Sequence, residues 1–403
     1  MKYNVAIVGG GAAGMLASFI AARRGRTVCL IEKNSQLGKK ILITGKGRCN
    51  VTNSASIEDF IANTAVNANF LYSAFYSFTN TDLMDMLESA GLKLKTERGG
   101  RVFPVSDKAV DVRNTLQSLV KDSGVKVICG EVKNITREDE LFTVKLSGSE
   151  ITADSVIIAT GGVSYPLTGS TGDGYKFAKN FGHTVIEPKA SLVPLVTEEK
   201  YVSEAMGLSL KNIEIHLKRN NKEIFNDFGE MLFTHFGLSG PVVLSASSHI
   251  RDNAKYTLSI DLKPALDFKT LDNRILRDFE ENKNKDFINS LDALLPKKLI
   301  PLIVKLSGID EREKVNSITR EKRHNLVNLL KNLEFTIKGK RSVSEAIITS
   351  GGINVKEISS STMESKLAPG LFFAGEVIDV DAYTGGFNLQ IAFSTAYLAG
   401  MNA

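Results

Sequence analysis

The chain has 403 residues, a formal net charge of +5 and a hydrophobic fraction of 43%. That length suggests about two or three domains, and the apolar content excludes intrinsic disorder. Its three cysteines are too scattered for a disulfide framework or a thiolate metal site. No apolar run approaches the roughly 18 residues of a membrane-spanning helix, and no signal peptide is recognisable. We therefore expect a cytoplasmic globular protein that holds no metal and contacts no membrane.

The first elements of the chain predict a dinucleotide-binding βαβ unit. An apolar strand leads into Gly9–Gly14, which satisfies the pattern G-x-G-x-x-G, and a helical pattern follows. Gly9 would permit the tight turn, Gly11 the approach of a diphosphate to the backbone, and Gly14 the close packing of helix on strand. Glu32 ends the next strand, where a carboxylate binds a ribose diol and disfavours the 2′-phosphate of NADP. The nucleotide is therefore NAD-like or FAD.

Three later segments favour FAD over NAD. Thr44–Asn53 is a glycine-punctuated loop with hydrogen-bonding side chains, which suits a large polar ring system. Buried strands are expected to end at Thr160–Gly162 and at Gly375–Glu376, and the second leads through Asp381–Gln390 into a final helix. A dinucleotide served from both chain ends must be long, and FAD is the longer of the two. No second G-x-G-x-x-G follows a strand, so a separate nicotinamide domain is not expected.

These motifs carry a family resemblance that runs along nearly the whole chain. The chain resembles the glutathione-reductase-type FAD fold and, more narrowly, the bacterial flavoprotein family of NAD(P)/FAD-dependent oxidoreductases. Aminoacetone-oxidase-like proteins and 3-dehydro-bile-acid reductases are members of that family. The stretch Gly-Lys-Gly-Arg-Cys-Asn is specific to the narrower family. The segments that carry the resemblance are Gly9–Gly14, Thr44–Asn53, Thr160–Gly174, Glu230–Pro241 and Gly375–Gln390.

The resemblance implies a set of FAD contacts. The glycine turn would meet the diphosphate, Glu32 the adenosine ribose, and the backbone of Val132 the adenine. Glu376 would bind the ribityl chain, and the N-terminus of the final helix would lie beside flavin N1 and O2, where reduced flavin is negatively charged. The expected cofactor-binding residues are Gly9, Gly11, Ala12, Ala13, Gly14, Glu32, Lys33, Lys40, Thr44, Gly45, Gly47, Arg48, Cys49, Asn50, Val132, Ala159, Thr160, Gly161, Gly162, Gly375, Glu376, Gly385, Gly386, Phe387, Asn388 and Leu389.

The expected fold class is α/β, with a Rossmann-like FAD-binding domain of the glutathione-reductase type and one inserted domain. The FAD-binding domain would comprise residues 1–191 and 342–403. Between them, residues 192–265 show strand patterns and residues 266–341 helical patterns. We expect a small β-barrel or sandwich followed by a helical bundle, placed as a lid over the flavin.

Three side chains are candidates for catalysis or substrate binding. The phenol of Tyr383 is placed to donate a proton to a carbonyl or enone opposite flavin N5. Arg48 would hold an anionic or carbonyl substrate or the flavin itself, and His235 lies in a segment that carries the resemblance. For each of the three, a structural role is the competing interpretation. Cys49 has no partner cysteine nearby, which excludes dithiol chemistry and favours a packed small residue.

These observations predict a two-electron FAD oxidoreductase that transfers hydride through flavin N5. In the favoured reaction, NADH or NADPH binds transiently, and an activated C=C bond in an apolar, bile-acid-like or steroid-like small molecule is reduced. The alternative is an amine oxidase that forms hydrogen peroxide. A further alternative, an RNA-associated flavoprotein, is motivated by residues 297–341, which hold 12 Lys/Arg and 5 Asp/Glu. Such a charge run is more often a solvated helical face, so no nucleic acid partner is expected.

Overall fold

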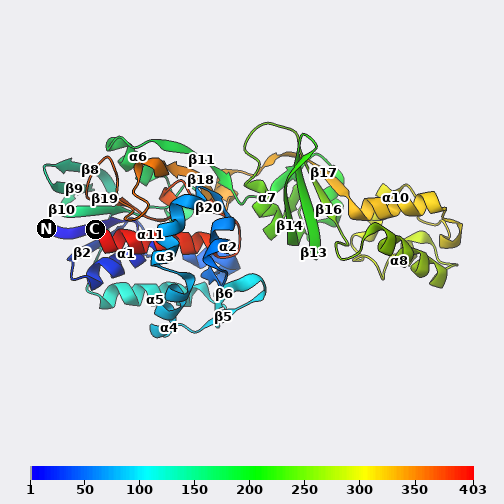
Figure 1. The fold of residues 1–403 in the computed structure, drawn as a ribbon, viewed down its shortest axis with the longest axis horizontal. Helices are drawn as coiled ribbons and strands as arrows, with labels where there is room; N and C mark the ends of the chain where they lie inside the picture. The colour runs from blue at the N-terminus through cyan, green and yellow to red at the C-terminus, as the bar shows by residue number, and fades with distance from the viewer. Residues whose placement is uncertain (1) are drawn as a thin grey trace. The chain divides into compact units, whose positions relative to one another are not determined.

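A computed structural model describes residues 2–403 and divides them into two units, each with its own hydrophobic core (Figure 1). The first unit consists of the residues up to Ser191 together with Val343–Ala403, and the second unit is Leu192–Ser342. In sequence, the second unit is therefore an insert in the first.

A seven-stranded sheet forms the centre of the first unit, with strand order β7-β2-β1-β10-β9-β8 and β19 paired to β10. The pairs β1–β2, β1–β10, β2–β7 and β10–β19 are parallel, whereas β8, β9 and the first half of β10 are antiparallel. Val5–Val8 and Val156–Ile158 are buried, as is usual for strands of a parallel sheet that is covered on both faces. The strands are β1 (Lys2–Val8), β2 (Val28–Glu32), β7 (Lys126–Cys129), β8 (Val132–Glu138), β9 (Leu141–Leu146), β10 (Ser149–Ile158) and β19 (Leu371–Phe373).

Two helices from opposite ends of the chain pack against each other beside this sheet. They are α1 (Ala12–Arg23), which follows β1, and the last helix, α11 (Phe387–Asn402). Gly400 allows their close approach, because a Cβ there would lie 2.7 Å from the carbonyl oxygen of Ala17. The guanidinium of Arg24 donates to the carbonyls of Gly400 and Ala403 at the end of α11. Both chain ends therefore share one core.

Three small sheets complete the first unit, in the orders β3-β6-β5, β20-β4 and β11-β18. The last two each pair a strand that precedes the insert with a strand that follows it. The strands are β3 (Thr52–Asn53), β4 (Thr64–Val66), β5 (Leu94–Thr96), β6 (Arg101–Pro104), β11 (Val185–Ser191), β18 (Ile348–Ile353) and β20 (Asp381–Ala382). The remaining helices are α2 (Ile57–Ala62), α3 (Tyr72–Ser77), α4 (Asn80–Ser89), α5 (Ala109–Asp122) and α6 (Asp173–Asn180).

In the second unit, six strands close into a barrel in the order β12-β15-β14-β13-β16-β17. The strands are β12 (Leu195–Thr197), β13 (Ser209–Arg219), β14 (Lys222–Phe233), β15 (Gly237–Ser239), β16 (Tyr256–Asp261) and β17 (Leu333–Lys340). The helices are α7 (Pro241–Ser247), α8 (Phe268–Glu281), α9 (Ile300–Ser307) and α10 (Arg320–Lys331), and α8 packs against α10 (Figure 1). The predicted fold class, with an inserted barrel, is confirmed.

The expectation that residues 266–341 are helical throughout is wrong at their end, where β17 lies. β17 pairs with β12 and β16 and so closes the barrel. Leu333, Phe335 and Ile337 of this strand are buried with a period of two. This pattern directly follows leucines at helical spacing in α10, at positions 326, 329 and 330. Leu333 fits both patterns, and the pairing with two neighbouring strands makes it part of the barrel.

Candidate dinucleotide site

The turn between β1 and α1 is as tight as the glycine pattern predicts. Gly9 has φ +108°, and a Cβ there would lie 2.5 Å from the carbonyl oxygen of Ala159. A Cβ at Gly14 would lie only 1.8 Å from the carbonyl oxygen of Gly9. Neither position therefore admits a side chain, because the backbone itself fills the space.

At Gly11, by contrast, no neighbouring protein atom requires glycine. It is the N-cap of α1, with an ordinary φ of −79°, and a Cβ there would meet no atom of residues 2–403 within 4 Å. The N–H groups in the first turn of a helix have no acceptor within the helix, and they attract anions. In α1 they include the N–H groups of Ala12 and Ala13. The open space at Gly11 therefore fits the diphosphate of a dinucleotide.

Glu32 holds this turn from the end of β2. Its Oε2 accepts from the N–H of Gly10 at 2.7 Å, and its Oε1 accepts from the backbone and side-chain nitrogens of Asn34 at 2.8 and 2.7 Å. The carbonyl of Glu32 accepts from the N–H of Gly130 at 2.9 Å, which brings the start of β8 at Val132 to the same edge. The expected ribose-binding and adenine-binding residues are therefore neighbours.

Lys33 is engaged by the protein. Its Nζ lies 2.6 Å from Oδ2 of Asp173 and also donates to Thr171. Gly172 is the N-cap of α6, and no side chain caps this helix. Lys33 instead ties the end of β2 to the start of α6.

The loop over residues 44–50 has an unusual backbone. Positive φ angles occur at Gly45 (56°), Lys46 (57°), Gly47 (85°) and Cys49 (62°), and two of these residues carry side chains. Left-handed non-glycine residues store strain, which is common where backbone is shaped for a ligand. Thr44 supports the loop by donating its hydroxyl to the carbonyl of Ile41 at 2.7 Å.

Cys49 is fully buried in this loop. Burial raises the pKa of its thiol to about 12, partly opposed by a hydrogen bond with Thr44. Since the thiolate is the reactive form, Cys49 behaves as a packed small residue.

Arg48 is held by acidic side chains rather than left open for a substrate. Its Nε donates to Oδ1 of Asp107 at 2.8 Å, and its two Nη groups reach Glu97. The guanidinium also stacks over the ring of Phe103, 4.1 Å from its centroid. Arg48 thus fastens the strained loop to the β5–β6 hairpin, which favours a structural role.

The short strand β3, which follows the strained loop, contacts the start of α11. A Cβ at Gly386 would lie 2.3 Å from the carbonyl oxygen of Thr52, and Nδ2 of Asn53 donates to the carbonyl of Gly385 at 3.0 Å. Deeper in the core, the Thr52 hydroxyl donates to Oε1 of Gln390 at 2.7 Å. Two expected cofactor segments, distant in sequence, are therefore in contact.

The first turn of α11 is fixed from its own side as well. Asn388 bonds the backbone of Ala382 with both ends of its amide, at 2.9 and 2.7 Å. The ring of Phe387 packs edge-on against Phe60. Leu389 follows in the same turn. The helix N-terminus, the expected flavin N1 site, is thus rigidly placed by side chains from both chain ends.

Glu376 is the centre of a polar network. Its Oε2 lies 2.6 Å from Nζ of Lys40, and its Oε1 accepts from the hydroxyl of Ser164 and the N–H of Thr349, both at 2.8 Å. The carboxylate lies beside Gly162, where a Cβ would be 3.3 Å from Oε1. Ser164 and Thr349 were not predicted, and Thr349 carries no motif or periodicity that marks it.

Gly375, just before Glu376, approaches α1. A Cβ at Gly375 would lie 3.0 Å from the Cβ of Ala13. The C-terminal strand β19 therefore ends directly beside the diphosphate turn.

Three buried polar atoms near these segments have no hydrogen-bond partner among the described residues: Oδ1 of Asn50, Oγ1 of Thr160 and the hydroxyl of Tyr175. Burial raises the pKa of Tyr175, and the nearby Glu376 and Asp379 add to the shift. Buried polar groups are normally satisfied, so unpaired ones indicate a missing partner. With the open space at Gly11, they fit a bound FAD.

The remaining catalytic candidates stay predictions. Tyr383 follows β20, and its N–H donates to the carbonyl of Asn63 at 2.9 Å, only two residues before Gly385. His235 belongs to the second unit, where it is exposed and contacts Phe236 edge-on.

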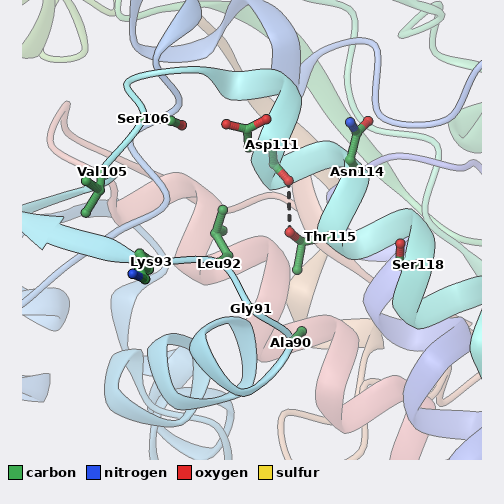
Figure 2. A pocket seen from close by; sticks show the side chains of 10 residues that line it. All are labelled: Ala90, Gly91, Leu92, Lys93, Val105, Ser106, Asp111, Asn114, Thr115 and Ser118. Atoms are coloured by element: carbon green, nitrogen blue, oxygen red, sulfur yellow. Dashed lines mark hydrogen bonds between the residues drawn. The ribbon is translucent and has the colours of Figure 1, made fainter.

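A separate hollow of about 530 Å³ is lined by the turn between α4 and β5, the segment after β6, and α5 (Figure 2). Ser106, Asp111 and Asn114 are among its lining residues, and the Thr115 hydroxyl donates to the carbonyl of Asp111. None of the expected cofactor residues lines it. Among residues 2–403, no helix is long and apolar enough to cross a membrane.

Several known proteins are similar to this chain in sequence or in fold. Ribosomal RNA dihydrouridine synthase of Escherichia coli K12 is 33% identical over 98% of this chain and 96% of its own. A 3-dehydro-bile acid delta(4,6)-reductase of Clostridium scindens is 30% identical over 99% of this chain and 98% of its own. A 3-ketosteroid-delta4-(5alpha)-dehydrogenase of Rhodococcus jostii RHA1 shares the fold, with a TM-score of 0.55 and 14% identity over 100% of this chain and 96% of its own.

The family model described as the HI0933-like protein Rossmann domain matches residues 3–402, almost the whole chain. The predicted flavoprotein resemblance is thereby confirmed. The chain belongs to this HI0933-like family of FAD-binding Rossmann proteins and is an FAD-dependent oxidoreductase.

Proposed function

We propose that this enzyme reduces a C=C bond conjugated to a carbonyl, and that its substrate is a uracil base in RNA. One observation carries the proposal: two named relatives with different substrates share this type of reaction. Dihydrouridine is uridine with hydrogen added across C5=C6, a bond conjugated to the C4 carbonyl. The delta(4,6) double bonds of a 3-dehydro bile acid are likewise conjugated to a ring ketone.

RNA is favoured because the relatives named for ribosomal RNA dihydrouridine synthesis are 33% and 32% identical over nearly their full lengths. This differs from the sequence-based expectation of an apolar, bile-acid-like substrate without nucleic acid. A bile-acid-like enone is the second candidate, supported by the relative that is 30% identical.

The first unit supplies the parts that such a reaction needs. Bound FAD provides two-electron hydride chemistry. The turn at Gly11 would hold the diphosphate, and the network of Lys40 and Glu376 would hold the ribityl chain. The N-terminus of α11 would stabilise negative charge on the reduced ring. The hydroxyl of Tyr383 would donate the proton that balances hydride addition to the conjugated bond.

An anaerobic titration tests the reductant. Addition of NADH or NADPH to the purified yellow protein is expected to bleach the flavin absorbance. Bleaching by an amine instead, with hydrogen peroxide on return to air, would support the amine-oxidase alternative and contradict the proposal.

A second assay tests the substrate. The reduced enzyme is offered an unmodified ribosomal RNA transcript or a 3-keto-delta4 steroid, and products are examined by mass spectrometry. We expect uridine in the RNA to gain two hydrogen atoms as the flavin reoxidises. Reduction of the steroid with no change in the RNA would reject the RNA substrate and favour the second candidate.

A further inference from the structure

The basic segment that suggested RNA is largely neutralised by folding. Four of its cations pair with carboxylates that lie outside residues 297–341. The pairs are Lys305–Glu204, Lys314–Asp286, Arg323–Asp272 and Lys331–Asp261. These four pairs offset about half of the excess positive charge of the segment, and the anion site proposed below lies outside it.

A hollow of about 260 Å³ along α8 is lined by hydrogen-bond donors. Its lining residues are Leu266, Thr270, Asn273, Arg274 and Arg277. The four residues on α8 are spaced by three or four positions, so they share one face of the helix.

The acceptors at the start of α8 are already engaged. Nζ of Lys331 donates to the carbonyl oxygens of Leu266 at 2.7 Å and Lys263 at 3.2 Å. Asp267 caps α8 by accepting from the N–H of Thr270 at 2.7 Å. These hydrogen bonds engage the carbonyls of Leu266 and Lys263 and one oxygen of Asp267 with partners other than the guanidinium groups of the hollow.

Donors, by contrast, remain available. Asp278 binds only Nε of Arg274, with both oxygens at 2.9 Å, and it lies 4.0 Å from Nε of Arg277. The Nη groups of Arg274 and the amide of Asn273 have no hydrogen-bond partner within residues 2–403. Burial lowers the pKa of Lys263, and the positive charge of Arg274 lowers it further. Two guanidinium groups therefore share the single carboxylate of Asp278, which leaves unused donors and an excess of positive charge.

We propose that this hollow binds a phosphate group of the RNA backbone. Guanidinium groups present forked donors that match phosphate oxygens, and an amide N–H₂ adds a neutral donor. The assignment to RNA rests on the proposed function, whereas the phosphate chemistry rests on the donors themselves.

The test replaces Arg277 with glutamate. Its side chain is 64% exposed and makes no hydrogen bond within the described chain, so Arg277→Glu should leave the fold intact. The matched control is Arg320→Glu, the same charge change at the exposed first residue of α10. Arg320 does not line the hollow.

Binding of a fluorescent uridine-containing RNA hairpin is measured by anisotropy across a range of salt. Arg277→Glu is expected to weaken binding about tenfold and to reduce the slope of log K against log salt by about one. Arg320→Glu is expected to change affinity less than about twofold. Equal binding by the two variants would overturn the proposal.

Inorganic pyrophosphate separates this proposal from the proposed function. If the wild type neither binds nor reduces RNA, but pyrophosphate raises its Tm and not that of Arg277→Glu, the RNA substrate fails and the phosphate site stands. If RNA uridine is reduced equally by the wild type and Arg277→Glu at low salt and low RNA concentration, where a phosphate contact contributes most, the site fails and the proposed function stands.

Discussion

At the scale of single residues, Gly11 and Gly14 show that one motif can require glycine for two different reasons. A side chain at Gly14 would collide with the backbone of Gly9, whereas one at Gly11 would enter open space. Gly11 is therefore the glycine that we assign to ligand binding, because the folded protein has room for a side chain there.

This difference predicts opposite effects of the same substitution. Gly11→Ala should unfold within about 1 kcal/mol of the wild type, because only an N-cap preference changes, yet bind FAD at least about tenfold more weakly. Gly14→Ala should lose about 4 kcal/mol or more, because its Cβ has no space. Urea unfolding of the apoprotein measures the free energy of unfolding, and titration with FAD measures the affinity for the cofactor. Full FAD affinity in Gly11→Ala would contradict the diphosphate assignment.

The three thiols are expected to react very differently. Burial raises the pKa of Cys29 and of Cys49 to about 12, whereas Cys129 is exposed. At about pH 8 only about one buried thiol in 10⁴ is ionised, so iodoacetamide should label Cys129 alone in the native protein. Peptide mass mapping after quenching gives the sites, with labelling in urea as the control. Rapid native labelling of Cys49 would restore it as a reactive centre.

At the scale of elements, the start of α11 is placed by a distant segment of the chain as well as by its own side chains. Asn53 donates to the carbonyls of Gly99 and Gly385, and its oxygen accepts from the N–H of Ala55. The side chain is 3% exposed. Asn53 is thus a positioning residue for the helix end that faces the expected flavin ring.

Removing this clamp should change the electronic properties of the flavin. Asn53→Ala frees the Gly385 turn, so the positive end of α11 stabilises reduced flavin less, and the midpoint potential should fall by about 10–20 mV. Asn402→Ala, which removes a hydrogen bond to Leu398 at the far end of α11, is the control and should leave the potential unchanged. A potential that is the same in both variants would show that Asn53 serves stability alone.

At the scale of the whole molecule, the insert enters and leaves through neighbouring strands. In the second unit the N–H of Arg341 donates to the carbonyl of Pro194 at 3.0 Å. In the first unit Ser191 pairs with Ile348 across β11 and β18. In each unit, the two points at which the chain passes to the other unit are therefore hydrogen-bonded neighbours.

This arrangement predicts that the FAD-binding unit folds alone. A chain in which residues 192–342 are replaced by a short Gly-Ser linker should unfold cooperatively and stay yellow, because its core does not include the insert. It should no longer reduce RNA, which would lose the phosphate contact proposed on α8. Thermal unfolding with flavin fluorescence and the RNA assay test both parts. A colourless or aggregated product would show that FAD binding needs the insert.

Local patterns carried most of the fold. Alternation, glycine spacing and helix stops predicted β1, α1, β2 and α11, because each depends on residues within one turn or one strand. β17 was missed, since its identity depends on two strands that are far away in sequence. Ser164 and Thr349 were missed for the same reason: nothing near them shows that both would reach Glu376.

The amino-acid sequence by itself predicted the FAD-binding Rossmann fold that the family model confirms, because the steric need for glycine and the period of buried residues are local properties. Only the tertiary structure decided that Arg48 is bound by Glu97 and Asp107, that four cations of the basic run pair with distant carboxylates, and which residues line the hollow along α8. The physical reason is that a charge is defined by its partners, and partners distant in sequence meet only when the chain folds.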